Sequence, residues 1–123
     1  MSWHIDAEPE HERIRITTSG EMGPREFKAM TIAGLAAANA AGVRRVLVDH
    51  RAMVPGVAPV DIHDLPRLFE RLGVPSTLRI ATIVPAEYRS LFDFFQALVW
   101  NRGEHHFRNF DDEAEASRWL QGN

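Results

Sequence analysis

Residues 45–50 have the sequence RVLVDH, and this stretch decides the fold class. Its run of valine and leucine lacks the alternation of apolar and polar residues that marks a strand with one face in water. Such a run is typical of an interior strand of a parallel sheet, which is covered on both faces. Residues 78–84, LRIATIV, form a second run of this kind, closed by Pro85. We therefore predict two interior strands of a parallel sheet.

Helical patterns lie between and beyond these strands. Pro24 suits the first turn of a helix, and Gly42 suits the residue that follows its last turn. Together with apolar residues at helical spacing, they predict a helix over residues 24–41. Further apolar stripes predict three more helices: residues 64–72 before Gly73, residues 88–103, and a final helix whose N-cap is Asp111 or Asp112.

The N-terminal region has a different pattern. Residues 2–6 and 13–18 alternate apolar and polar side chains, which predicts an antiparallel hairpin of two half-buried strands. Gly20 is expected to break the chain after the second of these strands. Residues 51–59, RAMVPGVAP, are expected to form a loop after RVLVDH, and residues 105–110 a short last strand.

The predicted order is thus ββαβαβαβα. Strands that alternate with helices favour an α/β fold with right-handed crossovers and helices on the faces of the sheet. We expect a mostly parallel five-stranded sheet with an antiparallel N-terminal hairpin. No internal repeat or linker interrupts the pattern, so residues 1–123 are expected to form one domain.

Composition excludes several classes of function. The chain has 123 residues, a formal net charge of -3 and no cysteine. The charge argues against a nucleic-acid partner, and the lack of cysteine rules out disulfides, thiolate metal sites and cysteine nucleophiles. The polar N-terminus is unlike a signal peptide, and no apolar stretch is long enough to span a membrane. We expect a cytoplasmic protein.

The stretches RVLVDHRA, RIATIV and HFRNFDDEAEASRWL, in the predicted order of elements, resemble the STAS-like, SpoIIAA-like family of small bacterial proteins. The likeness covers almost the whole chain, and its motifs are packing motifs, so it implies the fold. The better-known relatives, the anti-sigma-factor antagonists, carry a phosphorylatable serine at the helix N-terminus after the strand equivalent to RVLVDH. Residues 51–64 contain neither serine nor threonine, so a phosphorylation switch does not carry over.

Asp49, His50 and Arg51 follow at the end of the first interior strand. Open α/β sheets bind ligands outside the carboxyl ends of their strands, so these residues are candidates to anchor a small anionic or amphiphilic ligand. The structural alternative is that Asp49 accepts hydrogen bonds from loop amides and that Arg51 pairs with a nearby carboxylate.

A metal site is a second alternative for this region. Asp61, His63 and Asp64 could join Asp49 and His50 as ligands of a divalent cation. Their spacing matches no closed metal-binding motif, and Asp61 and Asp64 also suit the N-cap of the second helix. We therefore expect no metal and no other cofactor.

The third helix is unusually aromatic. Tyr88, Phe92, Phe94, Phe95 and Trp100 are spread around more than one of its faces, so the sheet cannot cover all of them. The aromatic side chains left exposed would form a surface for a protein partner or an apolar ligand. Alternatively, neighbouring loops or the last helix bury them.

The chain contains no GxSxG motif and no glycine-rich phosphate loop after a strand, so we expect no catalytic residues. The leading hypothesis is a non-enzymatic binding or regulatory module for a protein partner or a small apolar ligand. Tyr88, Phe92, Phe94 and Trp100 are its candidate contact residues, and the third helix is expected to mediate a homodimer. The alternative is a small metal-dependent or acid–base enzyme that uses Asp49, His50, Asp61 and His63.

Overall fold

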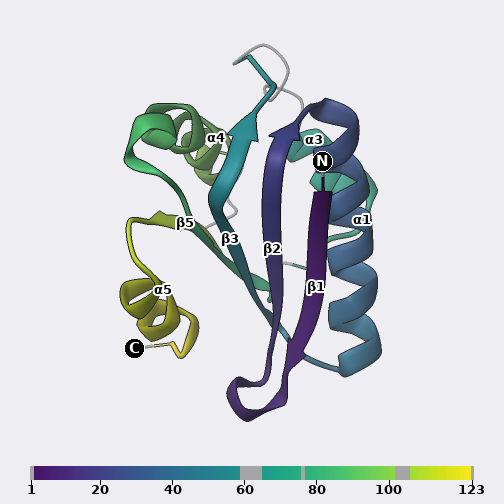
Figure 1. The fold of residues 1–123 in the computed structure, drawn as a ribbon. Coiled ribbons are helices and arrows are strands. Elements are labelled where there is room, and N and C mark those ends of the chain that lie inside the picture. Colours follow the sequence, from purple (N-terminus) through teal and green to yellow (C-terminus); the bar gives the residue numbers. More distant parts are fainter. Residues whose placement is uncertain (1, 59–64, 76, 102–105, 123) are drawn as a thin grey trace.

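The computed structural model describes residues 2–58, 65–75, 77–101 and 106–122. Its strands form one sheet in the order β1-β2-β3-β4-β5 (Figure 1). They are β1 (Ser2–Glu8), β2 (Arg13–Met22), β3 (Arg45–Pro55), β4 (Arg79–Ile83) and β5 (Phe107–Phe110). β1 runs antiparallel to β2, and all other neighbours are parallel. The predicted fold class is confirmed.

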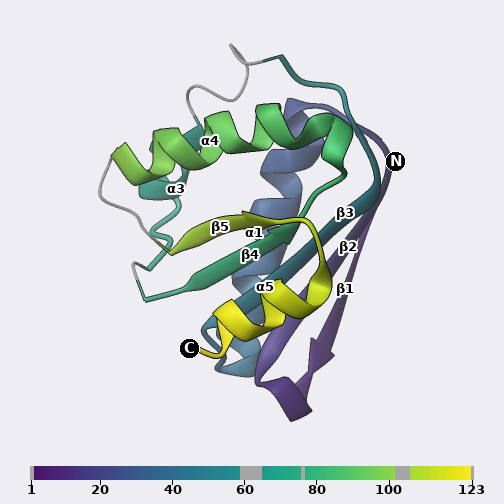
Figure 2. The same cartoon turned by 90° about the vertical axis from the view of Figure 1, so that its left-hand side faces the viewer.

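Helices cover both faces of this sheet (Figure 2). One face carries α1 (Pro24–Ala41), α3 (Leu65–Arg71) and α4 (Arg89–Asn101), and the other carries α5 (Glu113–Leu120). The described residues also form two short 3-10 helices: η1 (Pro9–His11) lies between β1 and β2, and η2 (Ala86–Tyr88) lies directly before α4. We refer to the two sides of the sheet as the α1 face and the α5 face.

The continuous apolar run of β3 follows from this arrangement. Val46 and Val48 pack in the core on the α1 face, whereas Leu47 packs against Leu120 and its neighbours on the α5 face. Successive side chains of a strand point to opposite faces, so a strand with a core on each side needs apolar residues at every position.

The helix α1 begins and ends where the sequence predicts. Gly42 follows it with a φ of 69°, and its amide donates to the carbonyl oxygens of Ala38 and Asn39. Gly34 allows the helix to approach β2, because a Cβ atom at this position would lie 2.7 Å from Cδ1 of Ile16. This close packing positions α1 over the sheet.

The strands β2 and β3 are longer than predicted. Thr17 pairs with Asp49, but Ser19 pairs with Ala52, so β3 has one extra residue at this point. Beyond this bulge the two strands pair as far as Met22 and Pro55. The predicted loop over residues 51–59 is therefore wrong for residues 51–55, and Gly20, with a φ of 71°, lies within β2 instead of ending it.

The remaining boundaries of helices and strands in the structure agree with the predicted ones within a few residues. Asp112 is the N-cap of α5, and its side chain accepts a hydrogen bond from the amide of Glu115. The last strand begins at Phe107. Three predicted boundaries lie outside the described residues: residue 105 for the start of this strand, residue 64 for the start of the second helix and residue 103 for the end of the third helix. Within the described ranges, no helix combines the length and the apolar character needed to cross a membrane.

Candidate functional site

A cavity of about 100 Å³ lies on the α1 face, enclosed by α1, α3, α4 and the sheet. Among its described lining residues, the side chains of Thr31, His50 and Thr82 contain a nitrogen or oxygen atom, and all the others are apolar. The lining residues Val57 and Val74 are half-buried, so part of the wall lies near the surface. The cavity is therefore an apolar space with a small number of polar groups, which is the usual character of a small-molecule site.

The alternation of β3 places His50 in this cavity. Val46, Val48 and His50 share the α1 face of the strand, and all three line the cavity. Phe27 and Phe92 flank the imidazole, with ring centroids 5.9 and 5.1 Å from its own. The side chain is 2% exposed, and its Nδ1 lies 2.8 Å from Oγ1 of Thr18.

Burial controls the protonation of His50. Removal from water disfavours the imidazolium form and lowers the pKa of His50 to about 4, although the negative charge of Asp49 acts in the opposite direction. The imidazole that faces the cavity is thus neutral at physiological pH.

The other two polar side chains of the cavity donate to protein groups. Oγ1 of Thr31 donates to the carbonyl oxygen of Phe27 one turn earlier. Oγ1 of Thr82 donates to Oδ1 of Asn109 on β5. The amide of Asn109 is oriented by its Nδ2, which donates to Asp93 at 3.1 Å, because a carboxylate can only accept.

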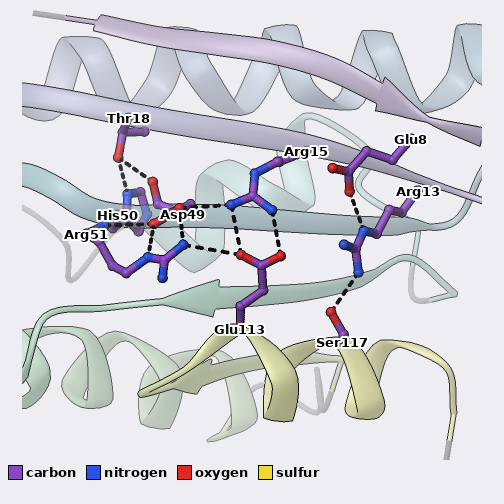
Figure 3. A network of polar contacts seen from close by, with 9 residues as sticks. All are labelled: Glu8, Arg13, Arg15, Thr18, Asp49, His50, Arg51, Glu113 and Ser117. Atoms are coloured by element: carbon purple, nitrogen blue, oxygen red, sulfur yellow. Dashed lines mark hydrogen bonds and ion pairs between the residues drawn. The ribbon is translucent and has the colours of Figure 1, made fainter. Parts of the chain in front are cut away.

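Asp49 lies on the α5 face and belongs to a network of charged side chains (Figure 3). Its Oδ1 accepts from the amide and Nε of Arg51, and its Oδ2 accepts from Nη2 of Arg51 at 2.7 Å and from Nη2 of Arg15 at 2.9 Å. Glu113 at the start of α5 accepts two hydrogen bonds from Arg15 and one from Arg51. Two guanidinium groups and two carboxylates thus satisfy one another between β2, β3 and α5.

The network shifts the pKa values of both carboxylates. Burial alone would raise the pKa of Asp49, but the hydrogen bonds from Arg51 and the charges of Arg51 and Arg15 outweigh it and lower the pKa. The hydrogen bond from Arg15 lowers the pKa of Glu113 against a smaller effect of burial. Both groups are therefore ionised at neutral pH and attach α5 to the sheet.

The two predicted site residues Asp49 and His50 are neighbours in sequence but not in space. Their side chains lie on opposite faces of the sheet, where Asp49 contacts two arginines and His50 contacts Thr18. The contacts of Asp49 and Arg51 correspond to the structural alternative considered for them. Asp61, His63 and Asp64 lie outside the described residues, and no group of three or more metal-ligating side chains occurs within the described ranges.

The aromatic side chains of the third predicted helix have different environments. Phe94 is 38% exposed, whereas Phe92 is buried beside His50 in the cavity and Phe95 is buried against Phe107. Trp100 is half-buried, and its Nε1 donates to the carbonyl oxygen of Phe107. Tyr88 is half-buried in the core on the α1 face, so Phe94 is the one exposed side chain among these five aromatic residues.

Sequence reasoning missed Thr18, Thr31, Thr82 and Phe27. A threonine within an apolar strand pattern, such as Thr82 in RIATIV, was a usable signal, because a buried hydroxyl needs a hydrogen-bond partner. The contact of Thr18 with His50 was not accessible in this way, because it depends on the register between β2 and β3.

Comparison with solved structures shows proteins of the same architecture. An uncharacterised protein of the DUF3478 family with a SpoIIAA-like fold, from Shewanella loihica PV-4, superposes with a TM-score of 0.57 at 21% identity, over 97% of this chain and 92% of that one. The anti-sigma factor antagonist SpoIIAA in its unphosphorylated form gives a TM-score of 0.59 at 14% identity, over 99% of this chain and all of that one.

The Bacillus cell fate determinant SpoIIAA in its phosphorylated form gives a TM-score of 0.55 at 14% identity, over 96% of this chain and 99% of that one. No protein-family model and no curated protein matches the chain. At these identities the likeness concerns the fold and not the activity. The chain has a SpoIIAA-like, that is STAS-like, fold.

Proposed function

We propose that this protein is a non-enzymatic binding module that takes up a small apolar or amphiphilic molecule in the cavity on the α1 face. The observation that carries the proposal is the cavity itself: about 100 Å³ of space with an almost entirely apolar lining. Close packing leaves few voids larger than a water molecule in protein interiors, so a space of this size beside a buried histidine calls for an occupant.

The volume sets the size of the buried part of the ligand. A dry apolar cavity of roughly 150 Å³ holds benzene, which corresponds to about 25 Å³ for each carbon atom. A volume of about 100 Å³ then suits about four or five non-hydrogen atoms. Because Val57 and Val74 are half-buried lining residues, a longer molecule could extend past them toward the surface.

On the α5 face, the carboxylates of the described network already have hydrogen-bond partners within the chain. Both oxygens of Asp49 and both oxygens of Glu113 accept hydrogen bonds from arginines. Arg51 directs its Nε and Nη2 to these carboxylates, so an anionic ligand there would compete with two negative charges that are already in place and need no ordering. For this reason we place the ligand on the α1 face.

A second candidate function is recognition of a protein partner or a second copy of the chain through α4. It is favoured by Phe94, which is one of the few large apolar side chains that the described surface exposes. Full burial of an exposed phenylalanine contributes about 1.5 to 3 kcal/mol, but Phe94 is only 38% exposed, so covering it contributes about 1 kcal/mol, which by itself gives a weak contact.

A titration with 1-butanol tests the ligand-binding proposal. This alcohol has five non-hydrogen atoms, and we expect a Kd of about 1 mM because a ligand of so few atoms has limited binding energy. The methyl NMR signals of Val46 and Val48, which line the cavity, should shift, while those of Leu120 on the α5 face should not.

A matched pair of variants locates the binding. Val74→Phe adds a ring at the cavity wall and should abolish the shifts, whereas Val54→Phe, at a position 47% exposed on β3 and outside the cavity, should leave them unchanged. Shifts that survive in Val74→Phe, or that centre on Leu120, would place the ligand elsewhere and refute the proposal.

A further inference from the structure

The contacts of Thr18 determine which nitrogen of His50 carries its proton. Oγ1 of Thr18 lies 3.1 Å from the carbonyl oxygen of Asp49 and 2.8 Å from Nδ1 of His50. A hydroxyl group has one proton, and a carbonyl oxygen can only accept, so this proton goes to Asp49. The hydroxyl oxygen must then accept from His50, which places the imidazole proton on Nδ1.

The other ring nitrogen is therefore an acceptor. A neutral imidazole has one proton, and the burial that lowers the pKa of His50 to about 4 keeps the ring neutral at pH 7. With Nδ1 protonated, Nε2 carries a lone pair and no hydrogen.

This lone pair is unused and accessible. Nε2 has no hydrogen-bond partner among the described residues, in which Nε of Arg79 is the one fully buried side-chain nitrogen or oxygen without a partner. Nε2 thus keeps access to open space although the residue as a whole is buried, and His50 lines the cavity. A polar atom that faces an apolar space without a hydrogen-bond partner costs free energy, which a ligand that donates to it would recover.

The side chains of the described lining also offer no competing donor. The hydroxyl protons of Thr31 and Thr82 are used on Phe27 and Asn109, and the imidazole proton of His50 is used on Thr18. The polar side chains of the described lining therefore present only acceptor lone pairs to a ligand. A carboxylate placed among them would be buried without a donor, which is strongly unfavourable.

We infer that the cavity selects uncharged molecules with a hydrogen-bond donor next to a short apolar group, of the class of alcohols, and that Nε2 of His50 accepts from this donor. The inference rests on the proposed function, since it names the ligand class of the same cavity. Thr18 is the positioning residue that keeps Nε2 unprotonated.

Two isomers test this selectivity. 1-Butanol and diethyl ether have the same atoms and the same number of non-hydrogen atoms, but only the alcohol donates a hydrogen bond. We expect the alcohol to bind about 3- to 10-fold more tightly, the range of one net neutral hydrogen bond. Butyrate should bind at least 10-fold more weakly than 1-butanol.

The variant Thr18→Val tests the origin of the preference. Without the hydroxyl, Nδ1 has no acceptor, so the proton should move to Nε2 and turn it into a donor. The alcohol-to-ether preference should then fall to about 1-fold, because both isomers can accept. Thr17→Val, the same substitution at the neighbouring position of β2, should retain the preference of the native chain.

The tautomer can be measured independently of any ligand. Long-range ¹H–¹⁵N spectra of the ligand-free protein should show the His50 proton on Nδ1, and in Thr18→Val on Nε2. Equal binding of the two isomers, tighter binding of ether or butyrate, or a proton on Nε2 in the native chain would each overturn the inference while leaving the cavity as a binding site. If neither isomer binds, the proposed function fails and this inference fails with it.

Discussion

The two sides of β3 differ in how completely their polar atoms are used. On the α5 face, Asp49 has every carboxylate oxygen engaged by Arg15 or Arg51, and Glu113 completes the network. On the α1 face, His50 has one nitrogen bound to Thr18 and the other directed to no described partner, beside about 100 Å³ of space.

This difference teaches where to look for a site. A conspicuous cluster of charges at the carboxyl ends of strands is a structural device when each charge already has its partner within the chain. A single histidine with an unused lone pair beside a cavity is a better candidate for a binding site than such a cluster. A ligand that donates to this lone pair supplies the hydrogen bond that the folded chain does not make.

The largest effect should come from truncating the two cores of β3. Leu47→Ala, at a fully buried position on the α5 face, should lower the free energy of unfolding by about 2 to 5 kcal/mol. Val48→Ala, which removes fewer atoms and borders the existing cavity, should cost about 1 to 3 kcal/mol. Urea unfolding of both variants measures this, and an equal or larger loss for Val48→Ala would erase the contrast between the faces.

As the pH falls, protonation of His50 on the α1 face should destabilise the protein before protonation of the carboxylates on the α5 face does. The unfolded His50 takes up a proton near pH 6.5, whereas the folded residue does so near pH 4, so the unfolded state binds more protons between these values. Stability should therefore fall by up to about 3 kcal/mol as the pH drops through this window.

The control for this window is His50→Phe, which has no titrating ring and should show a flatter dependence between pH 6.5 and 4. Asp49 and Glu113 have lowered pKa values, so their contribution is present above the ordinary carboxylate range and is lost below about pH 4. Urea midpoints that stay constant from pH 6.5 to 4 in the native chain would contradict the burial of a neutral His50.

Removal of one charge from the α5 network should have a smaller effect. Glu113→Gln should lower the free energy of unfolding by about 1 kcal/mol, a value reduced from that of a buried pair because the Glu113 side chain is 39% exposed. Glu115→Gln, an exposed position two residues along α5, should change it by less than about 0.5 kcal/mol. The difference between the two should shrink in high salt, and its absence at low salt would show that the network does not attach α5.

The smallest effect on stability should come from the exposed face of α4. Phe94→Glu should change the free energy of unfolding by less than about 1 kcal/mol, because Phe94 is 38% exposed and belongs to none of the core clusters of the described residues. If α4 mediates a homodimer, the same variant should lower the apparent mass in sedimentation. Phe92→Glu, which puts a charge beside His50, should prevent folding. A folded Phe94→Glu with an unchanged mass would remove α4 as the surface of self-association.

Much of the fold could be predicted from local signals. Pro24 and Gly42 determine the ends of α1, and Asp112 determines the start of α5, because each of these three boundaries depends on the local preference of a single residue. The extensions of β2 and β3 could not be predicted, because residues such as Gly20 and Pro55 lie in strands only by virtue of pairing between distant segments.

The site was predictable only in part. His50 was identifiable from its place at the end of an interior strand, and alternation alone separates it from Asp49. The space beside it depends on how far α1 and α4 stand from the sheet, which no short stretch of sequence encodes. The role of Thr18 depends on a register that the extra residue in β3 shifts.

That extra residue makes β3 change phase. Before it, even-numbered residues such as Val48 enter the core on the α1 face, and after it an odd-numbered residue, Met53, does so, while Val54 points outward. Deletion of one residue between Asp49 and Ala52 would turn the inward-facing side chains of the rest of β3 outward, and the outward-facing ones inward. In evolution, the loss of this extra residue must therefore be accompanied by a shift of one position in the hydrophobic pattern of the following residues. A search for distant relatives should look for these two changes together instead of similarity at single positions.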